Sequence, residues 1–415
     1  MDTQDFIIPP FVARMPHVSD YAEIDEVLRS QDFRQGSHQH TGMFMGGSVI
    51  MLDGEDHRRR RQTLSAMFSR AALQFYENGT LVPTVRQTME ELRQTRGPDG
   101  IVRTELVNLV RIFLHRISAL VTGIDNVTTM EETERFKDYI AVIGEGLTAE
   151  WTTLDRDQVI AHAMQVRERM IAEFFLPSFE RRKAMVEEFR AGKRERADLP
   201  TDLLTLLLLN WEPDWTLDYI WREATFFAIA STQTTTHNFP HLLVHLTEWF
   251  RDHPEDAHKA TDPDFLRLAE HESLRMHQPA PTLLRIATKD VVLSTGRKVA
   301  QGECVALLFT PANRDKGVFG ADAHVFNPYR AAPHGQRPWG LTFGSGPHIC
   351  IGRPLVTGQS SQGGDDNSAT YGTMVRMTRA LYEAGVILDP DHPPKRVTES
   401  YYDAYSEMRI LLPKL

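Results

Sequence analysis

Apolar residues recur three or four positions apart from about residue 21 to residue 250, which is the spacing of one face of a helix. Strand-like alternation is rare in that part of the chain. Short β-like pieces are predicted only later, at residues 289–293, 298–309 and 408–412. Helices followed by a few strands predict a mainly α fold, in which an α-rich domain carries a small β part. Residues 1–415 show no internal repeat and no second-domain boundary, so we expect a single domain.

The longest predicted helix spans residues 217–250, where charged residues are few. Such a segment is typical of a helix that passes through the middle of a large protein. Pro240 lies inside it and predicts a kink near His237, because proline cannot donate the backbone hydrogen bond of a helix. Upstream, residues 166–190 predict helix, residues 190–198 a charged surface connection, and residues 203–209 a further helix.

The composition is that of a globular protein, with 41% hydrophobic and 25% charged residues among 415 positions. The net charge of −10 argues against nucleic acid as a partner, since binding there depends on neutralising phosphates. The first residues lack a basic leader with an apolar core, and no apolar stretch reaches the roughly 18 residues of a membrane span. We therefore expect a soluble, cytoplasmic protein that does not enter a membrane.

Two cysteines are present, Cys304 and Cys350, so no disulfide framework is expected and a reducing compartment suits the chain. Cys304 adjoins an apolar run and is predicted to be a small buried residue. Cys350 lies in the segment from Phe343 to Gly352, which reads Phe-Gly-Ser-Gly-Pro-His-Ile-Cys-Ile-Gly. Its glycines allow the backbone to turn tightly and to approach a flat ligand. Backbone N–H groups can then point at the sulfur and shelter a thiolate.

This segment resembles the haem-binding loop of the cytochrome P-450 family, because it matches the pattern Phe-Gly-x-Gly-x-His-x-Cys-x-Gly at every fixed position. The resemblance covers most of the chain from residue 21 onward. It implies the cytochrome P-450 fold and haem b (iron protoporphyrin IX) as the cofactor. It also implies that the thiolate of Cys350 is the metal ligand, with Phe343, His348 and Gly352 among the residues that contact the haem.

Other elements of the family occur in the expected order. Glu272 and Arg275 match its Glu-x-x-Arg helix motif, in which the i, i+3 spacing places the acid and the guanidinium on one face. Arg330, in the segment 326–330, matches a second arginine of the family, and residues 312–315 fit the pattern between them. The resemblance thus implies a structural network of Glu272, Arg275 and Arg330 that braces the haem loop.

The two haem propionates need cationic or hydrogen-bonding partners inside a protein. His57 and Arg61 match a His-x-x-x-Arg arrangement of the family, and Arg285 and His348 match two further propionate contacts. The other arginines of the same basic run, at positions 58, 59 and 60, are expected on a helix that reaches the side of the haem where the family docks acidic electron-transfer proteins. A solvated helix face is the alternative interpretation of this run.

Residues 230–235 align with the family's oxygen-activation segment, Ala-Gly-x-acid-Thr-Thr, but differ from it at two positions. Ser231 replaces a glycine, and its hydroxyl can bond back to a carbonyl of the preceding turn. Gln233 replaces the carboxylate that helps to move protons, and an amide cannot titrate. By resemblance the catalytic residues are Gln233, Thr234, which hydrogen-bonds dioxygen, and Thr235, which could substitute for the acid. We expect monooxygenation to survive with slower or rerouted protonation.

Two further departures concern the layout of the chain. About 17 residues precede the segment 18–24, which resembles a strand-to-helix stretch that lies further into the chain in the family, so the N-terminal part is expected to be short. After the haem loop, residues 358–370 are rich in glycine, serine and other polar residues where the family has a continuous helix. We predict a loop insertion there.

The resemblance places the substrate against the long helix and against the segment that follows Arg275. Most side chains there are apolar, so a hydrophobic small organic molecule is the expected substrate. The predicted pocket residues are Phe226, Phe227, Ala230, Ala280, Thr282 and Leu283. No dinucleotide-binding fingerprint follows a strand, so electrons are expected from a separate ferredoxin or flavodoxin that an NAD(P)H-dependent reductase supplies.

Three functions remain open from the sequence. The favoured one is an O2-dependent monooxygenase that hydroxylates or epoxidises its substrate. The second keeps the haem thiolate but uses peroxide, couples substrates oxidatively or dehydrates them, and Gln233 favours it. The third is a haem-binding sensor without turnover, which the retained Thr234 and the apolar pocket disfavour.

Overall fold

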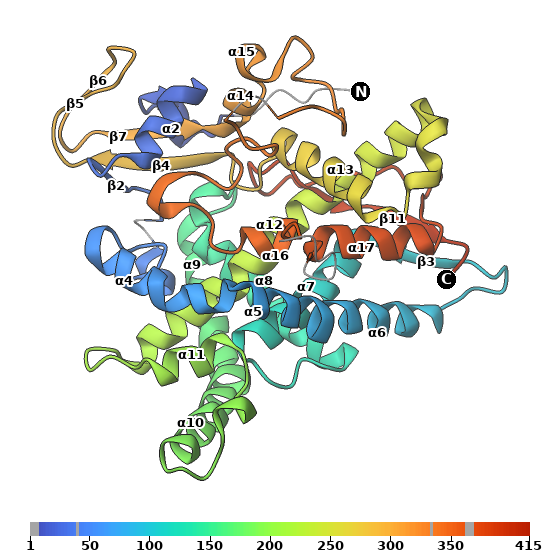
Figure 1. Cartoon of the computed structure of the whole chain (residues 1–415), viewed down its shortest axis with the longest axis horizontal. Helices are drawn as coiled ribbons and strands as arrows, with labels where there is room; N and C mark the ends of the chain where they lie inside the picture. Colours follow the sequence, from blue (N-terminus) through green and yellow to red (C-terminus); the bar gives the residue numbers. More distant parts are fainter. Residues whose placement is uncertain (1–7, 39–40, 333–334, 362–368) are drawn as a thin grey trace.

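The structure is a computed structural model that describes residues 8–38, 41–332, 335–361 and 369–415. Helices dominate it, as the hydrophobic pattern predicts, and they fill the middle and lower parts of the molecule in Figure 1. The α-helices are α1 (Pro10–Ala13), α2 (Tyr21–Arg29), α3 (Gly42–Met45), α4 (Gly54–Leu64), α5 (Arg70–Tyr76), α6 (Val82–Arg93), α7 (Leu106–Thr122), α8 (Met130–Leu147), α9 (Arg156–Met170), α10 (Leu176–Arg190), α11 (Leu203–Leu209), α12 (Leu217–Asp252), α13 (Pro263–Met276), α14 (Phe309–Asn313), α15 (Lys316–Phe319), α16 (Arg353–Thr357) and α17 (Gly372–Glu383).

The β part is small. Its strands are β1 (His17–Val18), β2 (Phe33–Gln35), β3 (Val102–Glu105), β4 (Thr282–Ala287), β5 (Val291–Val292), β6 (Lys298–Val299), β7 (Cys304–Leu308), β8 (Ile387–Leu388), β9 (Lys395–Arg396), β10 (Tyr405–Glu407) and β11 (Arg409–Leu412). The largest sheet has the order β1-β7-β4-β2, in which β1 runs parallel to β7 and the other neighbours are antiparallel. Within it Arg285 lies opposite Gln35 of β2 and Val305 of β7. This register brings a cation of β4 next to the N-terminal part of the chain.

The prediction that strands occur only late in the chain is wrong. Strands β1, β2 and β3 all precede residue 250, and β4 was not predicted as a strand. These strands have two to six residues, which is too short for a clear period-two pattern. They form because distant segments supply backbone partners, as where Val102 pairs with Leu412.

Helix α12 passes through the core, as its apolar pattern predicts. It begins after Thr216, whose side chain accepts a hydrogen bond from the backbone N–H of Tyr219. It then continues through Pro240 to Asp252, so the proline does not end the helix. Its side chains pack against α7 and α8, and Trp221 is among the fully buried ones. A helix held on several sides in this way can position side chains along its length.

Two further sequence predictions concern the surface. Residues 191–198 form a largely exposed connection after α10, and α11 occupies the predicted residues 203–209. Within the part of the chain that the structure describes, no helix is both long and apolar enough to cross a membrane.

The predicted insertion at 358–370 falls between α16 and α17, and its residues 362–368 lie outside the described residues. At its base the backbones of Gln359 and Thr370 exchange two hydrogen bonds of 2.9 Å. Gly358 and Gly372 beside them have positive φ, and a Cβ at either would lie 2.1 or 2.0 Å from a backbone carbonyl oxygen. Only glycine therefore fits where these two chain segments meet.

Candidate functional site

The loop around Cys350 is a set of tight backbone turns. The N–H of Cys350 donates to the carbonyl of Phe343 at 2.8 Å, and the N–H of Gly344 donates to that of Leu341 at 2.7 Å. Gly346 has φ +65, and a Cβ there would lie 2.3 Å from the carbonyl oxygen of Leu28 in α2. The glycines of the motif thus let the loop pack directly against a neighbouring helix.

The sulfur of Cys350 lies among groups that favour a thiolate. Burial is the largest influence and leaves the pKa of the thiol above its usual value, while hydrogen bonds from the backbone N–H groups of Gly352 and Arg353 and the guanidinium groups of Arg61 and Arg353 act in the opposite direction. The predicted N–H groups that point at the sulfur are therefore present. This arrangement suits a sulfur ligand that must remain ionised.

Behind the loop lies the predicted network of Glu272, Arg275 and Arg330. Arg275 donates from Nε and Nη2 to the two carboxylate oxygens of Glu272, at 2.8 and 2.7 Å, and Arg330 Nε donates to Glu272 Oε1 at 2.9 Å. Glu272 and Arg275 are buried, and Arg330 also pairs with Asp322 at 2.8 Å. The three residues meet as the resemblance implies.

Asn313 connects this network to the loop. Its backbone carbonyl accepts a hydrogen bond of 2.6 Å from Arg275 Nη1. Its side-chain oxygen accepts one of 2.8 Å from the backbone N–H of Leu341, and its amide nitrogen lies 3.2 Å from Thr342 Oγ1. Residues 341–342 immediately precede the cysteine loop. The network therefore holds the start of that loop through a buried polar side chain.

The four predicted propionate contacts gather on the other side of the loop. The rings of His57 and His348 stack with centroids 3.9 Å apart. Arg61 donates to the carbonyl of Ile349, next to Cys350. Arg285 is buried and donates to Gln35 Oε1 at 2.6 Å. Residues from α4, β4 and the cysteine loop thus form one basic group.

Sequence reasoning missed Asp53, the carboxylate within this basic group. It accepts from the backbone N–H of Gln35 at 3.2 Å and lies 3.3 Å from His348 Nε2. Burial opposes its ionisation, but the hydrogen bonds from His348 and Gln35 lower the pKa of Asp53. It stands four residues before His57 at the start of α4, a position typical of a helix cap. The side chain does not cap the helix, however, and it turns to His348 instead.

The electrostatics of the basic group fit a bound dianion. Burial and the neighbouring cations His348 and Arg61 lower the pKa of His57 to about 4, and burial lowers the pKa of Arg285 to about 10. Positive charge is therefore costly here, and Asp53 offsets only part of it. The two carboxylates of a haem would supply the remaining compensation, so the side chains present fit that cofactor.

The docking interpretation of the basic run needs a correction at Arg60. This side chain is buried, bonds Glu223 at 2.8 Å and lies over the ring of Trp215, 4.0 Å from its centroid. It faces the protein interior because Glu223 and Trp215 offer a buried partner and an aromatic face. Arg58 and Arg59 remain largely exposed, and they pair with acids of the surface. Only these two can form part of a docking surface.

On α12, the residues of the predicted oxygen-activation segment face different surroundings. Thr234 is exposed although it lies in the middle of a core helix, and its hydroxyl donates to the carbonyl of Ala230 at 2.8 Å. Ser231 bonds the carbonyl of Ala228 at 3.2 Å, which confirms the predicted back-bonding, and also contacts Ser118 of α7 at 2.8 Å. Thr235 is buried. Thr234 and Ser231 are therefore the two exposed hydroxyl residues of this segment.

Gln233 points toward α8, where its Oε1 lies 3.0 Å from the place that a Cβ on Gly144 would take. It lines a small pocket between α7, α8 and α12. The titratable residues that line the same pocket are Arg111, His115, Glu145 and His237. Burial lowers the pKa of His115 and of His237 to about 4, so both are neutral at pH 7. Sequence reasoning missed this pocket, because its members come from three helices, of which α12 lies far from α7 and α8 in the chain.

The predicted substrate residues lie on two elements. Phe226 and Ala230 are half-buried on α12, whereas Phe227 is buried and its ring lies 6.4 Å from that of Phe68. Ala280 precedes β4, in which Leu283 is half-buried. Thr282 is buried, and its hydroxyl has no hydrogen-bond partner among the described residues. An unpaired buried hydroxyl of this kind is suited to a polar group of a bound molecule.

Comparisons with known proteins all indicate the same family. The family model for cytochrome P450 matches residues 13–261 and 264–360. The biotin biosynthesis cytochrome P450 of Bacillus subtilis is 23% identical over 351 residues, which are 82% of this chain and 79% of that protein. Cytochrome P450(BM-1) of Priestia megaterium is 24% identical over 363 residues, covering 82% of this chain and 77% of that one.

Solved structures agree on the fold. The structure of CYP109E1 from Bacillus megaterium in complex with testosterone has a TM-score of 0.68, with 19% identity, and covers 99% of this chain and 96% of its own. A second structure is that of P450BioI in complex with hexadec-9Z-enoic acid ligated acyl carrier protein. It also has a TM-score of 0.68, with 20% identity, and the match covers 95% of this chain and 92% of that one. The predicted mainly α fold is thereby confirmed.

Proposed function

Because this chain belongs to the cytochrome P450 family, we propose that it takes an oxygen atom from O2 and inserts it into a hydrophobic small organic molecule, by hydroxylation or epoxidation. Its enzyme class, a haem-thiolate monooxygenase, follows from the family. The observation that carries the proposal is the loop around Cys350, where two backbone N–H groups and the guanidinium groups of Arg61 and Arg353 face the sulfur and oppose the rise in its pKa that burial causes. Haem supplies the redox chemistry that activates O2 when it is bound.

The cofactor in this proposal is haem b. Cys350 is its metal ligand, and Phe343 and Gly352 lie in the loop that carries this cysteine. His57, Arg61, Arg285 and His348 hold the propionates. Support comes from the compact basic group that these four side chains form, since Asp53 offsets only part of its positive charge.

The proposed roles on α12 concern protons. The hydroxyl of Thr234 lies on the exposed face of α12. Its O–H donates to the carbonyl of Ala230, so its oxygen lone pairs remain free to accept a hydrogen bond. Gln233 lines the same pocket as Arg111 and Glu145. We assign Glu145, the acid that lines this pocket, as the titratable group that substitutes for the missing carboxylate, with Thr235 as a further hydroxyl. Protons would then reach Thr234 from that pocket.

Replacing Gln233 with glutamate tests this assignment. A carboxyl beside Arg111 would restore a titratable group, so we expect turnover to rise roughly tenfold and peroxide leakage to fall. The measurement is the ratio of product to electrons consumed. Gln94→Glu, the same chemical change at the exposed residue that follows α6, is the control. Unchanged coupling and rate in Gln233→Glu would contradict the proposed role.

Electrons are proposed to come from a ferredoxin or flavodoxin with an NAD(P)H-dependent reductase. The proposed docking surface is the exposed face of α4, where Arg58 stands one turn before Arg61, the residue that bonds the cysteine loop. An acidic partner bound there would lie close to Cys350.

Reversing both exposed arginines, Arg58→Glu with Arg59→Glu, should therefore slow reduction by about tenfold at low salt, with a smaller difference at high salt. Stopped-flow reduction by a ferredoxin measures it. The control reverses two exposed arginines elsewhere, Arg93 on α6 and Arg135 on α8. Equal reduction rates in the two double variants would exclude this docking surface.

The substrate class is tested by binding and product analysis. Two of the similar solved structures are complexes, one with testosterone and one with hexadec-9Z-enoic acid ligated acyl carrier protein. We propose that Phe226, Ala230, Ala280 and Leu283 line an apolar site, that Phe227 supports it from the core, and that the unpaired hydroxyl of Thr282 contacts a polar group of the substrate. A panel of fatty acids and steroids should change the haem spectrum and give products that carry oxygen from 18O2.

An atypical haem-thiolate reaction is the second candidate, and Gln233 is the observation that favours it. Peroxide use, oxidative coupling or dehydration needs no proton delivery from a carboxylate at this position. Products formed with hydrogen peroxide but not with O2 and a reductase would support this alternative. A chain that binds haem but shows no spectral change with any compound would instead support a sensor.

A further inference from the structure

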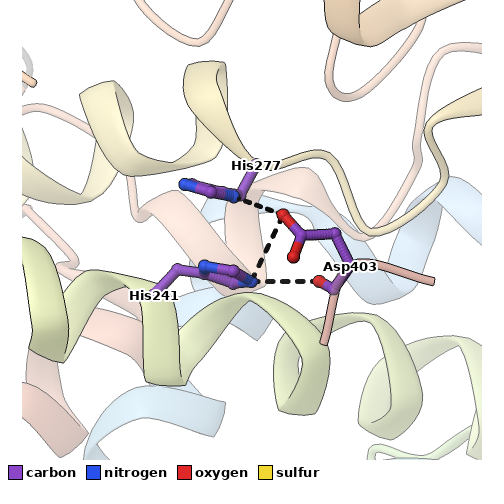
Figure 2. Close-up of side chains that lie close together, drawn as sticks. All are labelled: His241, His277 and Asp403. Atoms are coloured by element: carbon purple, nitrogen blue, oxygen red, sulfur yellow. Dashed lines mark hydrogen bonds and ion pairs between the residues drawn. The ribbon is translucent and has the colours of Figure 1, made fainter. Parts of the chain in front are cut away.

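A second group of ligating side chains lies away from the cysteine loop. His241 stands on α12 just after Pro240, His277 follows the last residue of α13, and Asp403 lies in the connection between β9 and β10. Figure 2 shows both imidazoles directing a nitrogen toward Asp403. Three segments that are distant in sequence therefore bring two imidazoles and a carboxylate to one point. The proposed oxygenation uses none of them.

The distances within this group are close to those of a metal site. His277 Nδ1 lies 2.8 Å from Asp403 Oδ2, and His241 Nε2 lies 3.8 Å from the same oxygen and 3.0 Å from the backbone carbonyl oxygen of Asp403, a contact that the metal would replace. One nitrogen from each histidine and one oxygen of Asp403 all lie within 4.8 Å of one another. Tetrahedral zinc with bonds of about 2.1 Å places its ligand atoms roughly 3.4 Å apart. Small side-chain rotations would therefore bring the three atoms to bonding distance.

The two histidines are packed against each other and against the carboxylate. Their rings stack with centroids 3.8 Å apart, and His277 Nδ1 lies 2.8 Å from Asp403 Oδ2. Neutral imidazoles and an ionised carboxylate are the forms in which these side chains bind a divalent metal.

Arg396 orients the carboxylate without blocking it. Its Nη1 donates to Asp403 Oδ1 at 2.6 Å, which leaves Oδ2 toward the histidines. His241 is almost fully buried, whereas the side chain of Asp403 is 44% exposed and gives access from solvent. A residue that fixes a ligand in this way is common beside metal sites.

We propose that His241, His277 and Asp403 bind a divalent transition-metal ion, with Zn2+ as the best match, at a site separate from the haem. Imidazole and carboxylate ligands suit zinc and its neighbours rather than Mg2+ or Ca2+, which prefer oxygen ligands throughout. Each histidine bonds the ion through the nitrogen that faces Asp403, and its proton moves to the other ring nitrogen. Three protein ligands leave one position for water or another small ligand.

Such an ion would clamp the segment 397–404 to the helices. The segment also touches the residues that follow α8, because the ring of Tyr402 stacks on Trp151 at 4.8 Å and the N–H of Tyr401 donates to the carbonyl of Trp151 at 3.1 Å. The bound metal would thus join α12, α13 and this C-terminal segment. Zinc should therefore raise the melting temperature of the protein by several degrees, since it binds only the folded chain.

The test measures the zinc and iron content of the haem-loaded protein by mass spectrometry. The protein is first incubated with Zn2+ and then dialysed, and iron reports how much haem is bound. The wild-type chain should retain about one zinc ion more than His241→Ala or Asp403→Asn. His392→Ala is the matched control, because His392 and Asp389 form a pair at the same 2.8 Å without a third ligand. The side chain of Asp389 is only 12% exposed, but no third ligating atom joins this pair among the described residues, so this control should retain zinc as the wild type does.

Calorimetry of His277→Gln provides a second readout if another variant folds poorly. It should fold and bind haem but lose the zinc-dependent rise in melting temperature. Equal zinc retention in the wild type and in the ligand variants, or no zinc-dependent shift in the wild type, would overturn the proposal.

Discussion

Replacing Cys350 with alanine is expected to reduce substrate oxidation to below detection while the chain remains folded. Two backbone N–H groups and the guanidinium groups of Arg61 and Arg353 face this sulfur, and alanine offers no ligand atom in its place. The loop itself is held by backbone bonds such as that from the N–H of Cys350 to Phe343, which alanine retains. Turnover and far-UV circular dichroism measure the two effects.

The control for this change is Cys304→Ala. Cys304 is half-buried at the start of β7 and contacts apolar neighbours, as its sequence context predicts in part. Its loss should leave oxidation unchanged. If Cys350→Ala retained the wild-type rate, or Cys304→Ala abolished it, the assignment of the thiolate would fail.

Replacing Arg275 with leucine is expected to destabilise the fold severely. Arg275 is fully buried, and the change would leave Glu272 with Arg330 as its remaining cation and would remove donors from the carbonyls of Asn313 and Ala323. Breaking a buried pair in this way costs about 3–5 kcal/mol, which approaches the whole stability of many proteins. Thermal unfolding and the yield of haem-loaded protein measure it.

Arg409→Leu is the matched control, since Arg409 forms a surface pair with Glu407 at 2.8 Å and is 49% exposed. Such pairs contribute about 0–1 kcal/mol. Similar melting temperatures for the two leucine variants would show that the buried network does not brace the loop.

Much of the site was predictable because its chemistry is local in sequence. The glycines around Cys350 signal tight turns, and the spacing of Glu272 and Arg275 places both on one helix face. The long apolar run that includes Thr234 similarly predicts the core helix α12. In each case the physical cause acts between residues that are close along the chain.

The features that sequence reasoning missed depend on contacts between distant segments. Arg60 belongs to a basic run whose sequence predicts a surface position. Its side chain is buried because it bonds Glu223, which lies 163 residues away in sequence. The position of Asp53 is typical of a helix cap, yet its side chain pairs with His348, which the fold brings close to it. The strands β1 to β3 depend on partners near or beyond residue 282. No local pattern carries that information.

The central claim is that Cys350 provides a thiolate ligand to haem, and the absorption spectrum of the reduced, carbon-monoxide-bound protein tests it most directly. The environment of the sulfur and the basic group around the propionates predict a Soret band at the red-shifted position typical of thiolate ligation. A band at the position typical of histidine ligation, or a protein that binds no haem, would contradict the claim.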